Sequence, residues 1–146
     1  MDKRGSDCLR ELIRVLVRNL GILEKSDASC CGVTISQCHA IVEIGRAKEI
    51  SLNELAELLT LDKSTMSRTI NKLVDNNLVT RELHSKDRRY VSIKLTEKGI
   101  NVFKTIEGNM HDYYENIFMS ISEDKREQIL DSLKVLTETI HKNNCC

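Results

Sequence analysis

Cysteine and histidine are concentrated in one short stretch of the chain. The residues concerned are Cys30, Cys31, Cys38 and His39. Thiolates and imidazole are ligands for soft metals, so this group would suit a thiophilic species such as arsenite, or zinc. Thr34 and Gln37 have the spacing of a capping box and predict a helix that begins just after Cys30 and Cys31. Because a helix N-terminus favours a thiolate over a thiol, we expect these two cysteines to be reactive.

A packing role for the same residues stays open. Cys38 alone fits a small buried core residue, and His39 alone fits an ordinary helix histidine. The segment also lacks the CxxC spacing of a strong metal motif. Thiol-based sensing and core packing are therefore both compatible with the sequence.

A second group of residues has the chemistry to bind phosphates and base edges. In residues 62–75 short hydroxyls come first and longer cationic or amide groups follow, an order that suits a helix entering the major groove of DNA end-on. The candidates for DNA contact in this helix are Lys63, Ser64, Thr65, Ser67, Arg68 and Lys72.

A polar loop at residues 84–89 supplies further candidates for DNA contact. They are Lys86, Asp87, Arg88 and Arg89. Three cations at the tip of a two-stranded ribbon can place an arginine in the narrow, electronegative minor groove. We expect Asp87 to orient an arginine rather than to repel DNA.

Two short amphipathic helices must position the candidate DNA contacts of residues 62–75. Ser51 and Glu54 have capping-box spacing, and an apolar stripe follows at Leu52, Leu55, Ala56 and Leu59. Asp62 is a good N-cap for the second helix. The inward face of that helix is predicted to consist of Met66, Ile70, Leu73 and Val74.

A β-hairpin is predicted to follow directly. Asn77 stands where a left-handed residue commonly ends a helix, and residues 78–82 and 90–95 are predicted strands. In the second strand, the alternation of apolar and polar residues predicts one buried face, formed by Val91, Ile93 and Leu95. The predicted fold class is mainly α with a small β-hairpin wing, a winged helix-turn-helix flanked by N- and C-terminal dimerisation helices.

At this point the chain resembles the MarR (multiple antibiotic resistance regulator) family of bacterial transcription factors. The matching segments are residues 62–68 (DKSTMSR), residues 73–79, the triplet 87–89 (DRR) and residues 95–99 (LTEKG). The resemblance implies a homodimer that binds a pseudo-palindromic operator in double-stranded DNA and usually represses transcription. One departure is Asn77, where the family mostly has glycine, but asparagine tolerates the same left-handed backbone.

Apolar stripes on long predicted helices at both ends of the chain are candidates for a dimer interface. They comprise Leu9, Leu12, Ile13, Leu16, Leu20 and Leu23 near the start, and Ile129, Leu130, Leu133, Leu136 and Ile140 near the end. A further helix from Thr96 to about Ile117 is predicted, with candidate buried residues Ile100, Phe103, Ile106, Met110 and Phe118. An intramolecular bundle would also bury these stripes. We favour a dimer, because the winged module is too small to cover three long helices.

The predicted organisation is a single MarR-like domain over residues 1–146. Dimerisation helices are expected at about residues 1–30 and 100–146, and the winged unit at about residues 34–98. By analogy with the family's intertwined terminal helices, Cys8, Cys145 and Cys146 are candidate thiols that reach across the subunits.

Charge distribution supports this organisation better than net charge does. The chain has 22 basic and 22 acidic residues, so its formal net charge is zero. Residues 62–94 carry eight basic and four acidic residues, a net charge of +4, whereas residues 99–146 carry five basic and eight acidic residues, a net charge of −3. The basic excess therefore coincides with the expected DNA contacts.

Other classes of protein fit the sequence less well. No apolar run approaches the roughly 18 residues of a membrane span, and the chain start lacks the apolar core of a signal peptide, so we expect a cytoplasmic protein. No CxxC, HExxH, nucleophile elbow or phosphate-binding glycine loop is present, so we do not expect an enzyme or a required cofactor. A winged protein-interaction module that does not bind DNA is a further alternative.

The sequence thus predicts a DNA-binding transcriptional regulator. Its expected form is a dimeric repressor, released from its operator by a thiol-reactive signal or by a soft metal or metalloid at Cys30, Cys31 and Cys38. The alternative is a repressor that responds to a small organic ligand in a cleft, with the cysteines uninvolved.

Overall fold

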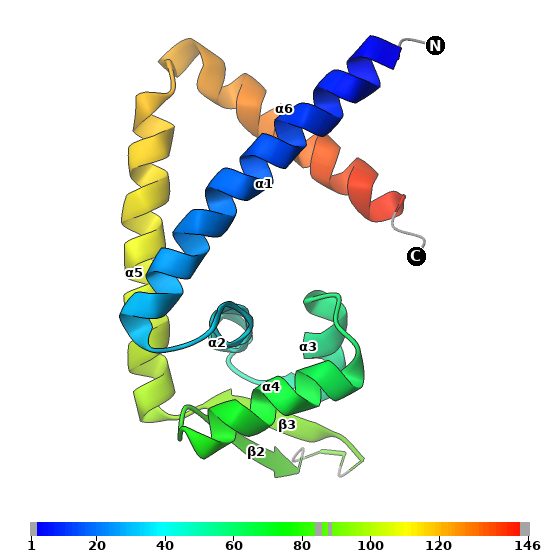
Figure 1. The fold of residues 1–146 in the computed structure, drawn as a ribbon. Helices are drawn as coiled ribbons and strands as arrows, with labels where there is room; N and C mark the ends of the chain where they lie inside the picture. Colours follow the sequence, from blue (N-terminus) through cyan, green and yellow to red (C-terminus); the bar gives the residue numbers. More distant parts are fainter. Residues whose placement is uncertain (1–2, 84–85, 88, 144–146) are drawn as a thin grey trace. The chain divides into compact units, whose positions relative to one another are not determined.

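The computed structural model of the chain describes residues 3–83, 86–87 and 89–143, apart from the side chains of residues 3 and 21–31. The chain divides into two compact units, residues 1–108 and residues 109–146. In chain order the elements are α1 (Lys3–Cys31), α2 (Ile35–Ala47), β1 (Ile50–Ser51), α3 (Leu52–Leu58), α4 (Lys63–Asp75), β2 (Val79–Leu83), β3 (Val91–Leu95), α5 (Glu97–Ser120) and α6 (Glu123–Lys142) (Figure 1).

The turn between α1 and α2 is short and well specified. Gly32 has a φ of 70°, a left-handed conformation that a glycine adopts without strain. The predicted capping box is confirmed, because Gln37 N donates to Thr34 Oγ1 at 3.2 Å and Thr34 N donates to Gln37 Oε1 at 3.1 Å. The box fixes the first residue of α2, whose buried face includes Ile41 and Ile44.

The helix-turn-helix consists of α3 and α4, and both helices end in the same way. After α3, Leu61 N donates to Ala56 O at 2.9 Å and Thr60 has a φ of 55°. After α4, Leu78 N donates to Leu73 O at 2.9 Å and Asn77 has a φ of 59°. Each end is therefore a Schellman motif, and the predicted left-handed Asn77 is confirmed.

The wing belongs to a three-stranded antiparallel sheet rather than to an isolated hairpin. The strand order is β1-β3-β2, with Ile50 opposite Ile93 and Val79 opposite Leu95. The sequence prediction missed β1 because two residues are too short to show alternation. It was also wrong about β3, where Val91 is exposed and Ser92 is buried. Ser92 lies between Ser51 of β1 and Glu82 of β2 in the sheet, and its hydroxyl donates to Glu49.

The core of the first unit confirms most of the predicted inward face. Met66, Ile70 and Leu73 of α4 are fully buried, and Val74 is half-buried. Further fully buried side chains come from all the surrounding elements: Ile41, Ile44, Leu55, Val79, Ile93 and Ile106. These residues pack α2, α3 and α4 on the sheet, so α4 is held with its opposite face in solvent.

Thr96 organises the junction between the end of α4 and the start of α5. Its N–H donates to Leu78 O at 3.0 Å, and its hydroxyl donates to Asn77 O at 2.7 Å. The hydroxyl in turn accepts the Gly99 N–H at 3.0 Å, as an N-cap does. The LTEKG segment thus joins α5 directly to the end of α4.

The predicted buried face of α5 is only partly correct. Ile106 is fully buried and Phe103 is half-buried against Gly45 of α2, but Ile100 and Phe118 are exposed. Too little of the described chain packs on α5 to cover its whole apolar stripe.

In the second unit, Arg126 of α6 binds the end of α5. Its Nε donates to the carbonyl oxygens of Phe118 and Ile121, both at 3.1 Å, and its guanidinium lies 5.2 Å from the centre of the Phe118 ring. No described residue of α6 is buried. Among the described residues, no helix is long and apolar enough to cross a membrane.

Candidate nucleic-acid interface

The helix α4 begins at a tightly capped N-terminus. Asp62 Oδ1 accepts hydrogen bonds from Thr65 N at 2.7 Å and from Ser64 Oγ at 2.8 Å. The Thr65 backbone bond, the Ser64 hydroxyl and the nearby charge of Arg68 lower the pKa of Asp62 from 3.8 to about 2. The carboxylate therefore stays ionised at neutral pH and fixes the first turn of the helix.

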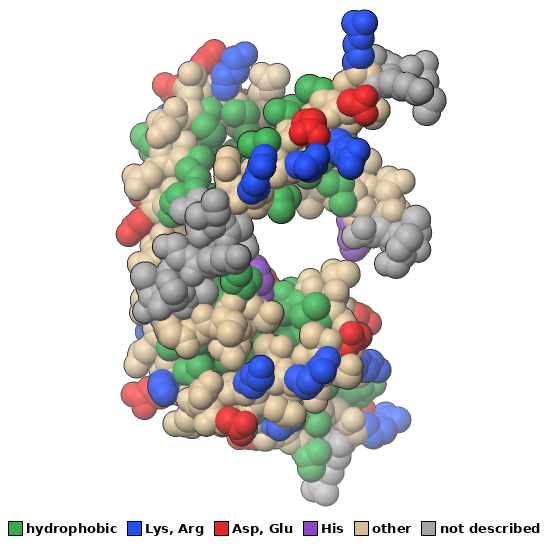
Figure 2. Space-filling model, viewed as in Figure 1, with side chains coloured by type: hydrophobic (Ala, Val, Ile, Leu, Met, Phe, Trp, Pro, Cys, Tyr) green, Lys and Arg blue, Asp and Glu red, His purple; other side chains and the backbone are tan. Residues whose placement is uncertain are grey.

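The solvent face of α4 contains the predicted DNA contacts. Lys63, Ser64, Arg68 and Lys72 are exposed, whereas Thr65 and Ser67 are half-buried. Lysine and arginine side chains lie over α4 in the space-filling view (Figure 2). Their role in DNA binding remains a prediction, but all six residues share the face that the core leaves open.

Two polar groups of this face already have partners within the helix. Ser64 donates to the Asp62 cap, and Arg68 Nη2 donates to Thr65 Oγ1 at 3.3 Å. Thr69, which the sequence analysis did not single out, is buried and donates its hydroxyl to Thr65 O at 3.2 Å. These bonds orient side chains on this face of α4, and the lysine and arginine residues of the face stay exposed.

At the wing, Asp87 holds Arg89 as the sequence analysis expected. Arg89 Nε donates to Asp87 Oδ1 at 3.0 Å and Arg89 Nη2 donates to Asp87 Oδ2 at 2.9 Å, a bidentate pair. The carboxylate raises the pKa of the Arg89 guanidinium, whose side chain stays 86% exposed. Lys86 is also exposed, and Arg88 lies outside the described residues.

Cys30 and Cys31 lie where two helices meet in the chain. Helix α1 continues through Cys31, so Cys30 and Cys31 form the end of that helix as well as preceding α2. The two cysteines precede the N-terminus of α2 as predicted, but the negative end of the α1 dipole lies at the same place and opposes the effect of α2 on their thiols. Their side chains lie outside the described residues, as do Cys145 and Cys146.

Cys38 and its neighbours have clearer surroundings. Cys38 is buried in α2, whereas the adjacent His39 is exposed and Cys8 is exposed on α1. Within the described part of the chain, no group of three or more His, Cys, Asp or Glu residues is arranged to hold a metal ion. The burial of Cys38 agrees with the packing role that the sequence left open.

One feature near the wing had no signal in the sequence. Glu49 accepts a hydrogen bond from the hydroxyl of Ser92, and its Oε2 lies 3.8 Å from Lys94 Nζ. The hydrogen bond between Glu49 and Ser92 joins residues that are 43 positions apart in the chain. No local pattern could reveal it, because it depends on the pairing of β1 with β3.

Comparison with known proteins agrees with this architecture. The sequence profile of the MarR family matches residues 33–91, from the end of the α1–α2 turn to the start of β3. The HTH-type transcriptional regulator BilQ of Clostridium symbiosum is 26% identical over 121 residues, which cover 83% of this chain and 84% of that protein.

Solved structures share the fold over almost the whole chain. A MarR transcriptional regulator from Methanosarcina mazei Go1 superposes with a TM-score of 0.79 and 29% identity, covering 93% of this chain and 98% of that one. Streptococcus pneumoniae FabT in complex with DNA superposes with a TM-score of 0.85, covering 95% and 99%, although identity is only 19%. The family profile, the curated relative and the shared winged fold all match this chain to the MarR family of DNA-binding transcriptional regulators.

Proposed function

We propose that the protein is a homodimeric repressor that binds a pseudo-palindromic operator. The observation that carries the proposal is the exposed cationic face of α4, which lies in the same unit as the Asp87–Arg89 pair of the wing. In this arrangement α4 would enter the major groove, and Arg89 would reach the adjacent backbone or minor groove. FabT, which has the same fold, has been solved in complex with DNA.

Operator binding can be tested by fluorescence anisotropy with a duplex taken from just upstream of the protein's own gene. Replacing Arg68, Arg88 and Arg89 with alanine should weaken binding and flatten its dependence on salt. Equal affinity and an equal salt slope in this triple variant would favour the interaction module and would refute the proposed interface.

The dimer is supported by apolar side chains that the described chain leaves exposed on α1 and on α6. On α1 they include Leu12 and Val17, and on α6 they include Leu133 and Ile140. Exposed apolar stripes of this length are typical of protein interfaces. Leu12→Asp or Leu133→Asp should therefore yield monomers in sedimentation velocity. The matched control is Leu58→Asp, because Leu58 is equally apolar and exposed but lies on the short helix α3.

The signal that we propose is thiol-reactive, acting at Cys30, Cys31 and Cys38. Cys30 and Cys31 end α1, and Cys38 stands one turn into α2, just after the short turn that joins the two helices. Arsenite would exchange each hydroxyl on arsenic for a thiolate sulfur and release one water for each thiol, whereas zinc would displace the thiol protons. Because Cys38 is buried, its capture would require α2 to shift.

A shift of α2 would bear on DNA binding, since α2 packs against both α4 and β3. The signal must favour the DNA-incompetent arrangement, and a coupling of about 1–3 kcal/mol is typical of regulators. A small organic effector that bypasses the cysteines is the second candidate, and the buried position of Cys38 favours it.

A titration of the protein–DNA complex distinguishes the two candidates. Arsenite, and separately zinc, should release the reduced wild type from DNA but should not release a Cys30→Ser/Cys31→Ser variant. Release of both proteins, or of neither, would refute sensing by this cysteine pair. The second outcome would direct the search to small organic ligands.

A further inference from the structure

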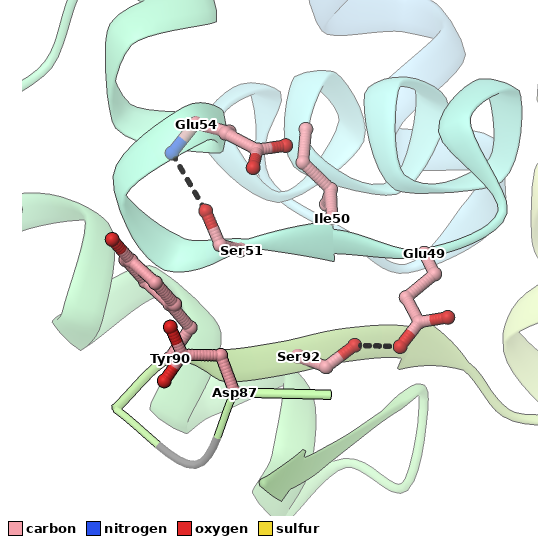
Figure 3. Close-up of a pocket in the computed structure, with 7 residues that line it drawn as sticks. All are labelled: Glu49, Ile50, Ser51, Glu54, Asp87, Tyr90 and Ser92. Carbon is pink, nitrogen blue, oxygen red and sulfur yellow. Dashed lines mark hydrogen bonds between the residues drawn. The ribbon is translucent and has the colours of Figure 1, made fainter. Parts of the chain in front are cut away.

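The short strand β1 connects the wing to the helix-turn-helix. Ile50 and Ser51 pair with Ile93 and Ser92 of β3, so β1 forms the inner edge of the wing sheet. Ser51 is also the N-cap of α3, where its hydroxyl accepts the Glu54 N–H at 3.1 Å (Figure 3). Any displacement of β3 is therefore transmitted to the first helix of the DNA-reading unit.

Glu49 reinforces this connection from the residue before β1. Its carboxylate accepts the hydroxyl hydrogen of Ser92, which is only 2% exposed (Figure 3). It also forms an ion pair with Lys94. A buried hydroxyl without a partner is unfavourable, so the bond holds Glu49 and Ser92 together. Glu49 thus contacts β3 at two alternate residues.

The tip of the wing has less support than its root. A hollow of about 310 Å³ separates the tip residues Asp87 and Tyr90 from Glu54 of α3 (Figure 3). The described side chains do not fill this space, so tight packing among them does not fix the tip on α3. Its direction depends on β3, and Arg89 lies only three residues before Ser92.

We propose that Glu49 is a positioning residue for DNA binding. By holding β3 at Ser92 and Lys94, it sets where the wing presents Arg89 relative to α4. The proposal rests on the DNA-binding function. The proposed effect of Glu49 on DNA affinity is opposite to the effect of its charge. A carboxylate near a DNA-binding surface repels phosphate, whereas Glu49 would favour binding by holding β3 in place.

The test compares two carboxylates on the two sides of β3. Glu82 of β2 pairs with Ser92 from the opposite side, is exposed, and forms no ion pair within the described residues. Glu49→Ala should weaken binding to the upstream duplex about threefold to tenfold, the equivalent of one lost hydrogen bond. Glu82→Ala should leave binding unchanged or tighten it, because only a repulsive charge is removed.

Two further variants separate positioning from general destabilisation. Glu49→Gln keeps an oxygen that can accept the Ser92 hydroxyl, so it should restore most of the affinity. Ser92→Ala should weaken binding as Glu49→Ala does, and the double variant should be no weaker than either single variant. Glu49→Ala should also lower the slope of log affinity against log salt by about one, since a wing contact with phosphate is lost.

The proposal is overturned if Glu49→Ala binds as tightly as Glu82→Ala, or if it binds weakly with an unchanged salt slope. Failure of the wild type to bind the duplex at any salt would instead contradict the DNA-binding function itself. The two failures are therefore distinguishable.

Discussion

Two glycines of α5 should respond to the same substitution with opposite signs. Gly99 is buried in the first turn, and a Cβ built there would lie 2.0 Å from the carbonyl oxygen of Leu78. Gly108 is exposed further along the helix, and a Cβ there would meet nothing within 4 Å. Glycine is therefore required at the first position and unfavourable at the second.

The expected magnitudes follow from these surroundings. Gly108→Ala removes the helix-interior penalty of glycine and should raise the free energy of unfolding by about 0.5–1 kcal/mol. Gly99→Ala makes the same gain, but its Cβ clashes with backbone that cannot rotate away. Forcing extra atoms into a packed site costs about 1–3 kcal/mol, so we expect a net destabilisation of about 1–2 kcal/mol.

Urea unfolding followed by circular dichroism would measure both changes at one protein concentration, because a dimer's stability depends on concentration. The Gly99→Ala variant should also bind DNA less tightly, since the Leu78 carbonyl follows α4 directly and accepts the Thr96 N–H. If Gly99→Ala were as stable as the wild type, the close approach of α5 to the end of α4 would be refuted.

Three further perturbations test other parts of the fold. Thr60→Gly should stabilise the protein by about 0.5–1 kcal/mol in urea unfolding, because a β-branched residue at a φ of 55° is strained; no gain would contradict the left-handed turn. Asp62 has its pKa lowered from 3.8 to about 2 in the folded protein, so its stabilising effect should be complete above about pH 4 and lost between about pH 4 and pH 2. The difference in urea midpoint between the wild type and Asp62→Asn should shrink as the pH is lowered through that window. A difference that stays constant would refute the capping geometry. Gly45→Ala would place a Cβ 2.4 Å from the Phe103 ring, and it should destabilise by about 1 kcal/mol unless the ring can shift.

Local chemistry made much of the fold predictable. The Asp62 cap, the Thr34–Gln37 capping box and the left-handed Asn77 each depend on residues a few positions apart, and each is present. The inward face of α4 followed from helical periodicity. These features needed no knowledge of distant contacts.

Long-range contacts set the limit of prediction at the wing. The alternation in β3 indicated a buried Val91, yet Ser92 is the buried residue, beside β1 in the sheet, and Glu49 supplies the partner for its hydroxyl. Likewise, the apolar stripe of α5 could not reveal which of its residues α2 would cover. Both outcomes depend on segments about 40 or more residues away in the chain.

The placement of α2 explains how a modest signal could control DNA binding. Ile41 and Ile44 are fully buried, and α2 packs against α4, which carries one predicted contact surface, and against β3, which directly follows the other at the wing tip. Burying one isoleucine side chain contributes about 1.5–3 kcal/mol, and a hundredfold change in affinity corresponds to about 2.8 kcal/mol. Exposing a single buried α2 isoleucine is therefore energetically comparable to a hundredfold change in affinity for DNA. A regulator built this way needs no large rearrangement, only a signal that binds better when α2 has moved.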